Sequence, residues 1–144
     1  MIIEGEDGVT HINIYSKART SLGRWLSNFT DSRFTLDGIE YGSIEGLWFS
    51  YTTGQEHIRM LHGFKAKQEG AKFEKIREID EDLVRRAIDE KLRNNPDKMR
   101  ELAESDLKLC HYYEYAGKRV DAHYEWLVEH FETRRKQLKE HYGK

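Results

Sequence analysis

The chain has 144 residues, of which 38% are hydrophobic, 12% aromatic and 35% charged. This composition excludes an intrinsically disordered protein, and the length suits one domain, so we predict a single domain over residues 1–144. With 24 basic and 26 acidic residues, the chain has no general attraction to nucleic acid, and such a contact would need a local basic surface. The candidates for that surface are Lys17, Arg19, Arg24, Lys65 and Lys67.

The first third of the chain carries strand and turn patterns. Residues 11–15 alternate as a strand, and residues 34–41 predict a hairpin that turns at Asp37 and Gly38, a pair that tolerates positive φ angles. Ser43 is a favourable N-cap for a helix that ends near Gly54. The apolar side of this helix is formed by Ile44, Leu47, Trp48 and Tyr51.

Helical patterns dominate the middle of the chain. Residues 55–70 predict two short helices that meet at Gly63. Residues 80–92 predict an amphipathic helix, and Asn95 with Pro96 predicts the start of another, because proline is tolerated at the first helical position. The expected buried residues of these two helices are Leu83, Val84, Ala87, Ile88, Leu92, Met99, Leu102 and Ala103.

The last part of the chain predicts one strand and one long helix. The strand covers residues 107–115 and includes Cys110, which we expect to be a buried small side chain and not a nucleophile. The helix runs from Asp121 to about His141 and exposes a basic segment near its end. Its expected buried residues are Tyr124, Leu127, Val128, Phe131 and Leu138, and the exposed segment is Arg134, Arg135 and Lys136.

Several function classes find no support in the sequence. The single cysteine excludes an intrachain disulfide, and a cytoplasmic protein is the default expectation. The first seven residues lack the apolar segment of a signal peptide, and no apolar run has the length of a membrane span. The seven histidines form no recognisable ligand pair. We therefore expect no metal, no cofactor and no membrane partner.

Glu45 is the main candidate for chemistry. It follows the N-cap Ser43 in the first helical turn, where the helix dipole favours an ionised carboxylate. A charged carboxylate beside aromatic residues suits the stabilisation of a developing cation or the activation of a water molecule, which is the chemistry of glycosidic cleavage. A serine followed by a glutamate is also a common helix start with no further role. The local pattern alone leaves both interpretations open.

Three motifs in a fixed order resemble the NADAR superfamily, also called the YbiA-like family. They are Leu-Ser-Asn-Phe at residues 26–29, Asp-Gly at residues 37–38 and Ser-Ile-Glu at residues 43–45. The resemblance is strong over residues 12–51 and weaker over residues 77–118. It implies a predominantly helical α+β domain with a few short strands, and an enzyme that cleaves N-glycosidic bonds in ribosylated or ADP-ribosylated compounds.

The resemblance also implies a set of site residues. Glu45 takes the position of the family's acidic residue, and Ser27, Asn28 and Phe29 take the positions of its Ser-Asn-Phe turn. Lys65 follows a glycine-containing turn that lies near the ligand in the family, which makes it a candidate phosphate contact; the alternative is a solvated surface charge. Arg24 is a second candidate for the diphosphate, and Trp48 is a second candidate, beside Phe29, for stacking on the base.

The chain departs from the family pattern in two places. Many members follow the glutamate with histidine, aromatic residues and a lysine one turn later, whereas here Gly46 follows and the lysine is absent. The family's late Trp-Gly-Asp-Gly segment is also absent, and Asp121 is the nearest stand-in for its acidic residue, which makes it a second catalytic candidate. These departures suggest a substrate other than the riboflavin-pathway intermediates on which some members act.

The function predicted on this basis is hydrolysis of the N-glycosidic bond of an ADP-ribosylated base, such as ADP-ribosyl-guanine in nucleic acid. The expected partner is an ADP-ribose-containing or ribosylated nucleotide, and the oligomeric state is left open. Three alternatives remain: an N-glycosidase for riboflavin-pathway ribosylamino-pyrimidines, a module that binds ADP-ribose or a nucleotide without cleaving it, and a small interaction protein that keeps the fold without the pocket.

Overall fold

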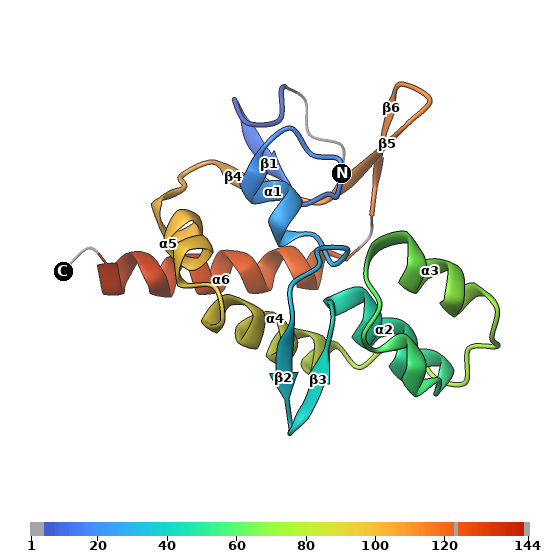
Figure 1. Cartoon of the computed structure of the whole chain (residues 1–144). Helices are drawn as coiled ribbons and strands as arrows, with labels where there is room; N and C mark the ends of the chain where they lie inside the picture. The colour runs from blue at the N-terminus through green and yellow to red at the C-terminus, as the bar shows by residue number, and fades with distance from the viewer. Residues whose placement is uncertain (1–4, 123, 143–144) are drawn as a thin grey trace. The chain divides into compact units, whose positions relative to one another are not determined.

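The computed structural model describes residues 5–122 and 124–142 (Figure 1). The regular structure of these residues consists of helices and three short two-stranded sheets. This confirms the predicted α+β class with a predominance of helix. In chain order the elements are β1 (His11–Asn13), α1 (Ser21–Leu26), β2 (Phe34–Leu36), β3 (Ile39–Tyr41), α2 (Ile44–Thr53), the 3-10 helix η1 (Glu56–Ile58), α3 (Gly63–Ala71), α4 (Glu81–Arg93), α5 (Pro96–Glu104), β4 (Lys108–Cys110), β5 (Tyr112–Tyr115), β6 (Lys118–Asp121) and α6 (Glu125–Tyr142).

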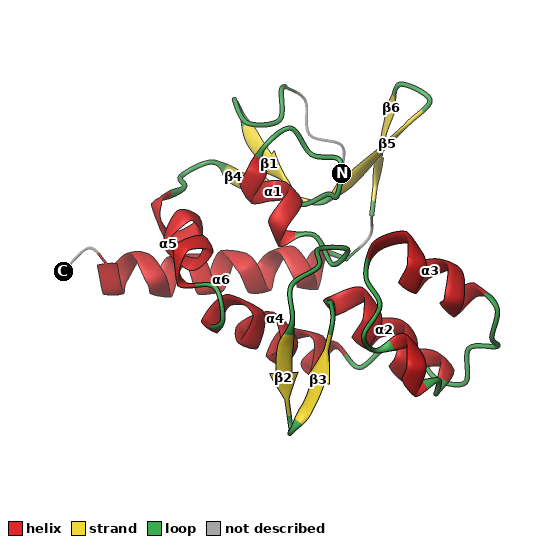
Figure 2. Ribbon diagram, in the orientation of Figure 1, coloured by secondary structure: helices red, strands yellow, loops and turns green. Residues whose placement is uncertain are grey.

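The described residues form two compact units. The central unit is Asn28–Asn95 and contains β2, β3, η1, α2, α3 and α4. The terminal unit combines residues 5–27 with residues 96–122 and 124–142, and it contains the remaining helices and strands (Figure 2). The single domain over residues 1–144 stays a prediction.

A hairpin and an amphipathic helix build one side of the central unit. Strands β2 and β3 pair antiparallel with Phe34 opposite Tyr41, and the turn has positive φ at both Asp37 and Gly38, as their sequence predicts. Helix α4 packs against β2, and its N-cap is Asp80, whose carboxylate accepts hydrogen bonds from the amides of Asp82 and Leu83. The predicted apolar stripe is confirmed for the four residues Val84, Ala87, Ile88 and Leu92.

The other side of the central unit is formed by α2, η1 and α3, and Figure 1 shows α2 and α3 side by side. Helix α2 has the predicted bounds, with Ser43 as its N-cap and Gly54 as a left-handed C-cap. The two short helices predicted over residues 55–70 are η1 and α3, and α3 begins at Gly63. Ile44 and Leu47 are fully buried, whereas Trp48 and Tyr51 are half-buried.

In the terminal unit, β1 pairs with β4 in parallel, with Ile12 opposite Leu109. The predicted strand over residues 11–15 ends at Asn13. The single strand predicted over residues 107–115 is wrong, because it divides into β4 and β5 with His111 between them. The cause is the Asn13 side chain, which accepts a hydrogen bond from the Tyr112 amide and donates one to the Tyr112 carbonyl, each at 3.0 Å. The following strand, β5, does not pair with β1 but with β6.

The start of the last helix also differs from the prediction. Residues 118–121 form β6, which pairs with β5 in a hairpin that places Tyr112 opposite Asp121. Helix α6 therefore begins at Glu125, and Tyr124 precedes it with 36% of its surface exposed instead of lying in the core. Of the predicted core residues in α6, Leu127 and Phe131 are buried, whereas Val128 and Leu138 are half-buried.

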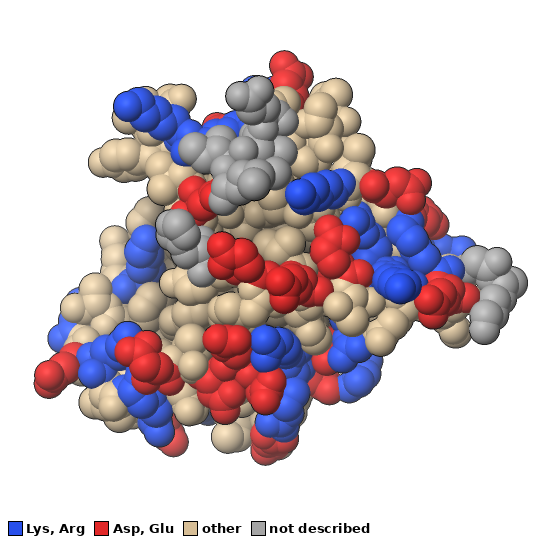
Figure 3. Space-filling model, turned by 180° about the vertical axis from the view of Figure 1, so that it is seen from behind, with Lys and Arg blue, Asp and Glu red and all other residues tan. Residues whose placement is uncertain are grey.

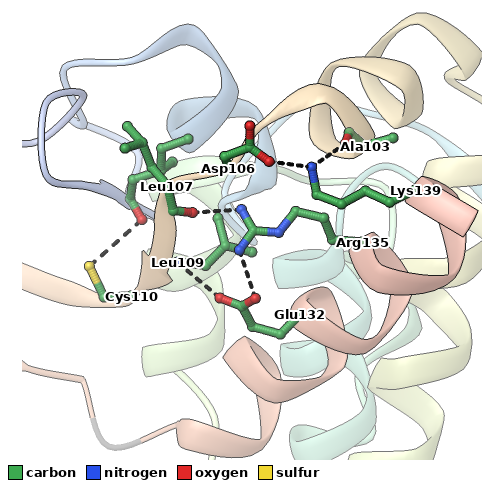
Figure 4. A network of polar contacts seen from close by, with 9 residues as sticks. Ala103, Asp106, Leu107, Leu109, Cys110, Glu132, Arg135 and Lys139 are labelled. Atoms are coloured by element: carbon green, nitrogen blue, oxygen red, sulfur yellow. Dashed lines mark hydrogen bonds and ion pairs between the residues drawn. The ribbon is translucent and has the colours of Figure 1, made fainter. Parts of the chain in front are cut away.

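Arg135 in α6 is buried, so its predicted place on a solvated face is wrong (Figure 4). Its guanidinium donates to the Leu107 carbonyl at 2.6 Å and to the Glu132 carboxylate at 2.7 Å. The other oxygen of Glu132 accepts the Leu109 amide at 3.0 Å. One turn later, Lys139 donates to Asp106 and to the Ala103 carbonyl. These paired charges fasten α6 to the segment that leads into β4.

Charges of both signs are interspersed on the face of the molecule in Figure 3. No large area of that face carries a single sign, in keeping with the near-balanced composition. Among the described residues, none of the helices combines the length and the apolar character that a bilayer crossing requires.

Candidate functional site

The candidate site is built around the start of α2, which a neighbouring loop holds tightly. The Ser43 hydroxyl accepts the Gly46 amide at 2.9 Å and donates to the Leu61 carbonyl at 2.8 Å. A β-carbon at position 46 would lie 2.5 Å from the carbonyl oxygen of Arg59, a distance that no side chain tolerates. Any residue larger than glycine after Glu45 would therefore force the backbone of the neighbouring loop to shift.

The turn at Asn28 and Phe29 fixes the first residues of two helices. The Asn28 carbonyl accepts the Glu45 amide at 2.9 Å, and the Phe29 carbonyl accepts the Gly63 amide at 3.1 Å. Glu45 lies in the first turn of α2, and Gly63 is the first residue of α3. Two successive carbonyl groups thus satisfy two amides that helix starts leave without intrahelical partners.

Glu45 is half-buried, and its burial raises the pKa of its carboxyl group to about 7. The positive charge of Lys67 on α3 opposes this effect and lowers the pKa. No hydrogen bond reaches the Glu45 carboxylate within the described part of the chain. Burial thus acts against the helix dipole, which favours the ionised form of a carboxyl group at this position.

The Asn28 side chain adds a second unusual group to this site. Its amide oxygen is buried, and no hydrogen-bond donor reaches it from residues 5–122 or 124–142. Buried polar atoms nearly always have partners, and one without a partner costs about 1–3 kcal/mol. A ligand hydroxyl is a group that would satisfy this oxygen.

Two phenylalanine rings and two lysines complete the central-unit part of the site. Phe29 is half-buried and meets Phe64 edge-on, with ring centroids 5.9 Å apart. Lys65 and Lys67 are both exposed on α3, and it is Lys67 whose charge acts on Glu45. The sequence prediction named Lys65 as the phosphate contact and gave Phe64 no role. Trp48, one turn after Glu45 in α2, is half-buried.

The other predicted site residues lie in the terminal unit. Ser27 is buried at the end of α1, where its amide donates to the Arg24 carbonyl at 3.3 Å. The Arg24 guanidinium donates to the carbonyl groups of Ala18 and Arg19, which fixes this exposed side chain near the helix. Asp121 is the last residue of β6 and is half-buried. The ligand contacts of these residues stay predictions.

Metal and thiol chemistry find no support in the described residues. No group of three or more His, Cys, Asp or Glu side chains that could hold a metal ion is present there. Cys110 is buried as expected, and burial raises the pKa of its thiol to about 11. A thiol with so high a pKa is a poor nucleophile at neutral pH.

Comparisons with known proteins support the fold. No protein-family model and no curated protein sequence matches this chain. Among solved structures, the NMR structure of the Escherichia coli protein YbiA is similar, with a TM-score of 0.64 and 19% sequence identity. The similarity covers 91% of this chain and 89% of YbiA. The chain therefore has a YbiA-like fold, and the resemblance that the three sequence motifs predict is confirmed at that level.

Proposed function

We propose that this protein is an N-glycosidase that hydrolyses the bond between ribose and the base of an ADP-ribosylated nucleotide, such as ADP-ribosyl-guanine in nucleic acid. The observation that carries the proposal is Glu45, a half-buried carboxyl group with a pKa of about 7 and no hydrogen-bond partner in the described chain. A group with this pKa exchanges protons readily at neutral pH, which general acid–base catalysis requires. The YbiA-like fold supports the same reaction class by analogy.

In the proposed reaction, the ionised Glu45 accepts a proton from a water molecule. The water oxygen bonds to C1′ of the ribose as the C1′–N bond breaks, and the electron pair of that bond stays on the base nitrogen, which takes a proton from solvent. The negative charge of Glu45 also stabilises the positive charge that develops on the ribosyl ring. Lys67 favours the ionised carboxylate, because it lowers the pKa toward the neutral range.

The remaining predicted residues bind the substrate in this proposal. The unpartnered Asn28 oxygen accepts a ribose hydroxyl, and Ser27 holds a second ribose or phosphate oxygen. Arg24 and Lys65 contact the diphosphate, and Phe29 and Trp48 line the base. Asp121 stays the second catalytic candidate.

The second candidate function is binding of ADP-ribose without cleavage. It is favoured by the absence of a lysine one turn after Glu45, where α2 continues with Gly46, Leu47 and Trp48. In that case the carboxyl group would recognise the ligand but would not act on it.

The deciding experiment incubates the purified protein with ADP-ribosylated guanosine and, separately, with ADP-ribosylated DNA, and measures released ADP-ribose by mass spectrometry. We expect release by the wild type, loss of release in Glu45→Gln and unchanged release in Glu40→Gln, a matched change at an exposed carboxylate of the same unit. A riboflavin-pathway ribosylamino-pyrimidine should be turned over more slowly. Binding of ADP-ribose by calorimetry without release from either substrate would replace the enzyme by the binding module.

A further inference from the structure

Phe64 is a large apolar side chain that remains 60% exposed. Burying a phenylalanine side chain stabilises a protein by about 1.5–3 kcal/mol. Because Phe64 lies mostly on the surface, it does not provide most of this stabilisation. The backbone beside it is nevertheless fixed, because the preceding residue, Gly63, donates its amide to the Phe29 carbonyl. The Phe64 ring also packs against Phe29, with the two ring planes 68° apart. Phe64 is therefore an exposed ring held in a defined place.

The position of Phe64 on α3 relates it to Glu45. Phe64 and Lys67 are three residues apart in the helix, and residues at this spacing share a face. Lys67 lies near enough to Glu45 for its charge to act on the carboxyl group, and α3 packs against α2. The exposed ring, the lysine and the half-buried carboxyl group thus belong to one side of the central unit.

We infer that Phe64 is the residue on which the leaving base of the substrate stacks, and that Phe29 acts through Phe64 by supporting its ring. This inference rests on the proposed function and adds a residue for recognition of the base. Of the two rings, Phe29 is half-buried and Phe64 is mostly exposed, so Phe64 offers more free surface to a planar base. Stacking of a base on an aromatic side chain contributes about 1–3 kcal/mol, and Lys67 on the same face suits the phosphates of a nucleotide.

The test measures binding in the Glu45→Gln background, which prevents turnover, with two probes: ADP-ribosylated guanosine and free ADP-ribose. Phe64→Leu keeps an apolar side chain but lacks the flat ring, and we expect it to weaken binding of ADP-ribosylated guanosine by about tenfold or more. Phe64→Trp should restore that binding, and free ADP-ribose, which lacks the leaving base, should bind equally well to all variants. The control is Phe73→Leu, a partly exposed phenylalanine that packs against His57.

A double variant tests the supporting role of Phe29. Phe29→Leu should weaken binding of ADP-ribosylated guanosine in the wild-type Phe64 background and have little further effect when Phe64 is already leucine. The inference is overturned if Phe64→Leu binds ADP-ribosylated guanosine as well as the protein with Phe64 does. It is also overturned if the effects of Phe29→Leu and Phe64→Leu on binding are additive. In either case, release of ADP-ribose by the wild type would still support the proposed function. If the wild type neither binds nor cleaves either probe, the proposed function and the inference both fail.

Discussion

Glu132 in the terminal unit and Glu45 in the central unit are half-buried carboxyl groups on helices, with opposite surroundings. Glu132 accepts the Leu109 amide and the Arg135 guanidinium, so both of its oxygens are occupied. Glu45 receives no hydrogen bond from the described residues, and burial raises its pKa to about 7. Hydrogen-bond partners therefore stabilise the charge of Glu132. Glu45 has lost part of its contact with water and has no such partners in exchange, which disfavours its charged form.

The difference separates a structural carboxylate from a candidate catalytic one. A carboxylate whose two oxygens both accept hydrogen bonds from the fold is held in place by them, and its removal weakens the fold. A carboxyl group that receives no hydrogen bond from the fold is available to a ligand. Its removal should stabilise the folded protein, because no charge then has to be buried. Each of the predictions below concerns one side of this comparison and measures either stability or activity.

The largest effect is expected for Glu45→Gln in the glycosidase reaction. The substitution removes the proton acceptor but keeps the size of the side chain, so the rate should fall by roughly 10²–10⁴-fold. Glu132→Gln, the matched change at the paired carboxylate, should leave the rate of the folded protein unchanged. The measurement is kcat from the release of ADP-ribose. Full activity in Glu45→Gln would show that Glu45 serves only the start of α2.

Arg135→Ala should produce the largest loss of stability. It leaves the half-buried Glu132 carboxylate and the Leu107 carbonyl without their donor, and a polar group left without its partner costs about 1–3 kcal/mol. Urea unfolding followed by circular dichroism measures the change in the free energy of unfolding. Arg134, also in α6, is half-buried and donates to Gln137, so Arg134→Ala is the contrast that removes a positive charge without removing a member of this network. A loss below about 0.5 kcal/mol in Arg135→Ala would contradict the structural role of this network.

The stability of Glu45→Gln should depend on pH relative to the wild type. The folded pKa of about 7 lies above the ordinary value of 4.5, so folding favours the protonated carboxyl group. Below pH 4.5 the carboxyl group is protonated in both states and the two proteins should be equally stable. As the pH rises from 4.5 to 7 the wild type loses stability, and at pH 8 Glu45→Gln should be more stable by about 3 kcal/mol. Equal stability at both pH values would contradict the raised pKa.

The smallest effect concerns the rate of the wild type as a function of pH. If the ionised Glu45 accepts the proton from water, kcat/KM should fall about tenfold per pH unit below an apparent pKa near 7. Lys67→Met removes the charge that lowers this pKa, so the midpoint should move to higher pH. A midpoint near the ordinary glutamate value would mean that another group controls the rate.

Local chemistry made much of the central unit predictable. Two helix caps and one turn depend only on residues close to them in the sequence, so they could be predicted. They are the N-caps Ser43 and Asp80 and the turn at Asp37 and Gly38. The Ser-Ile-Glu motif led to Glu45 for the same reason. Its position at a helix start was therefore predictable from residues 43–45 alone.

The features that sequence patterns missed depend on distant residues. Arg135 is buried because Leu107 and Glu132 supply acceptors, and the chain breaks at His111 because Asn13, nearly one hundred residues earlier, takes the backbone groups of Tyr112. The pKa of Glu45 is set by burial and by Lys67 on another helix. Apart from Glu132, which precedes Arg135 by three residues in α6, none of these partners lies within the window over which helix and strand periodicity operates.

The turn at Asn28 and Phe29 has a dynamic consequence. Since its two adjacent carbonyl groups hold the amides of Glu45 and Gly63, opening of this turn would release both amide protons in the same event. Their hydrogen-exchange rates should therefore respond together to temperature, denaturant and ligand, although eighteen positions separate them in the sequence. A ligand that tightens this turn would slow both exchanges at once, and the segments that carry Glu45 and Phe64 would then open together.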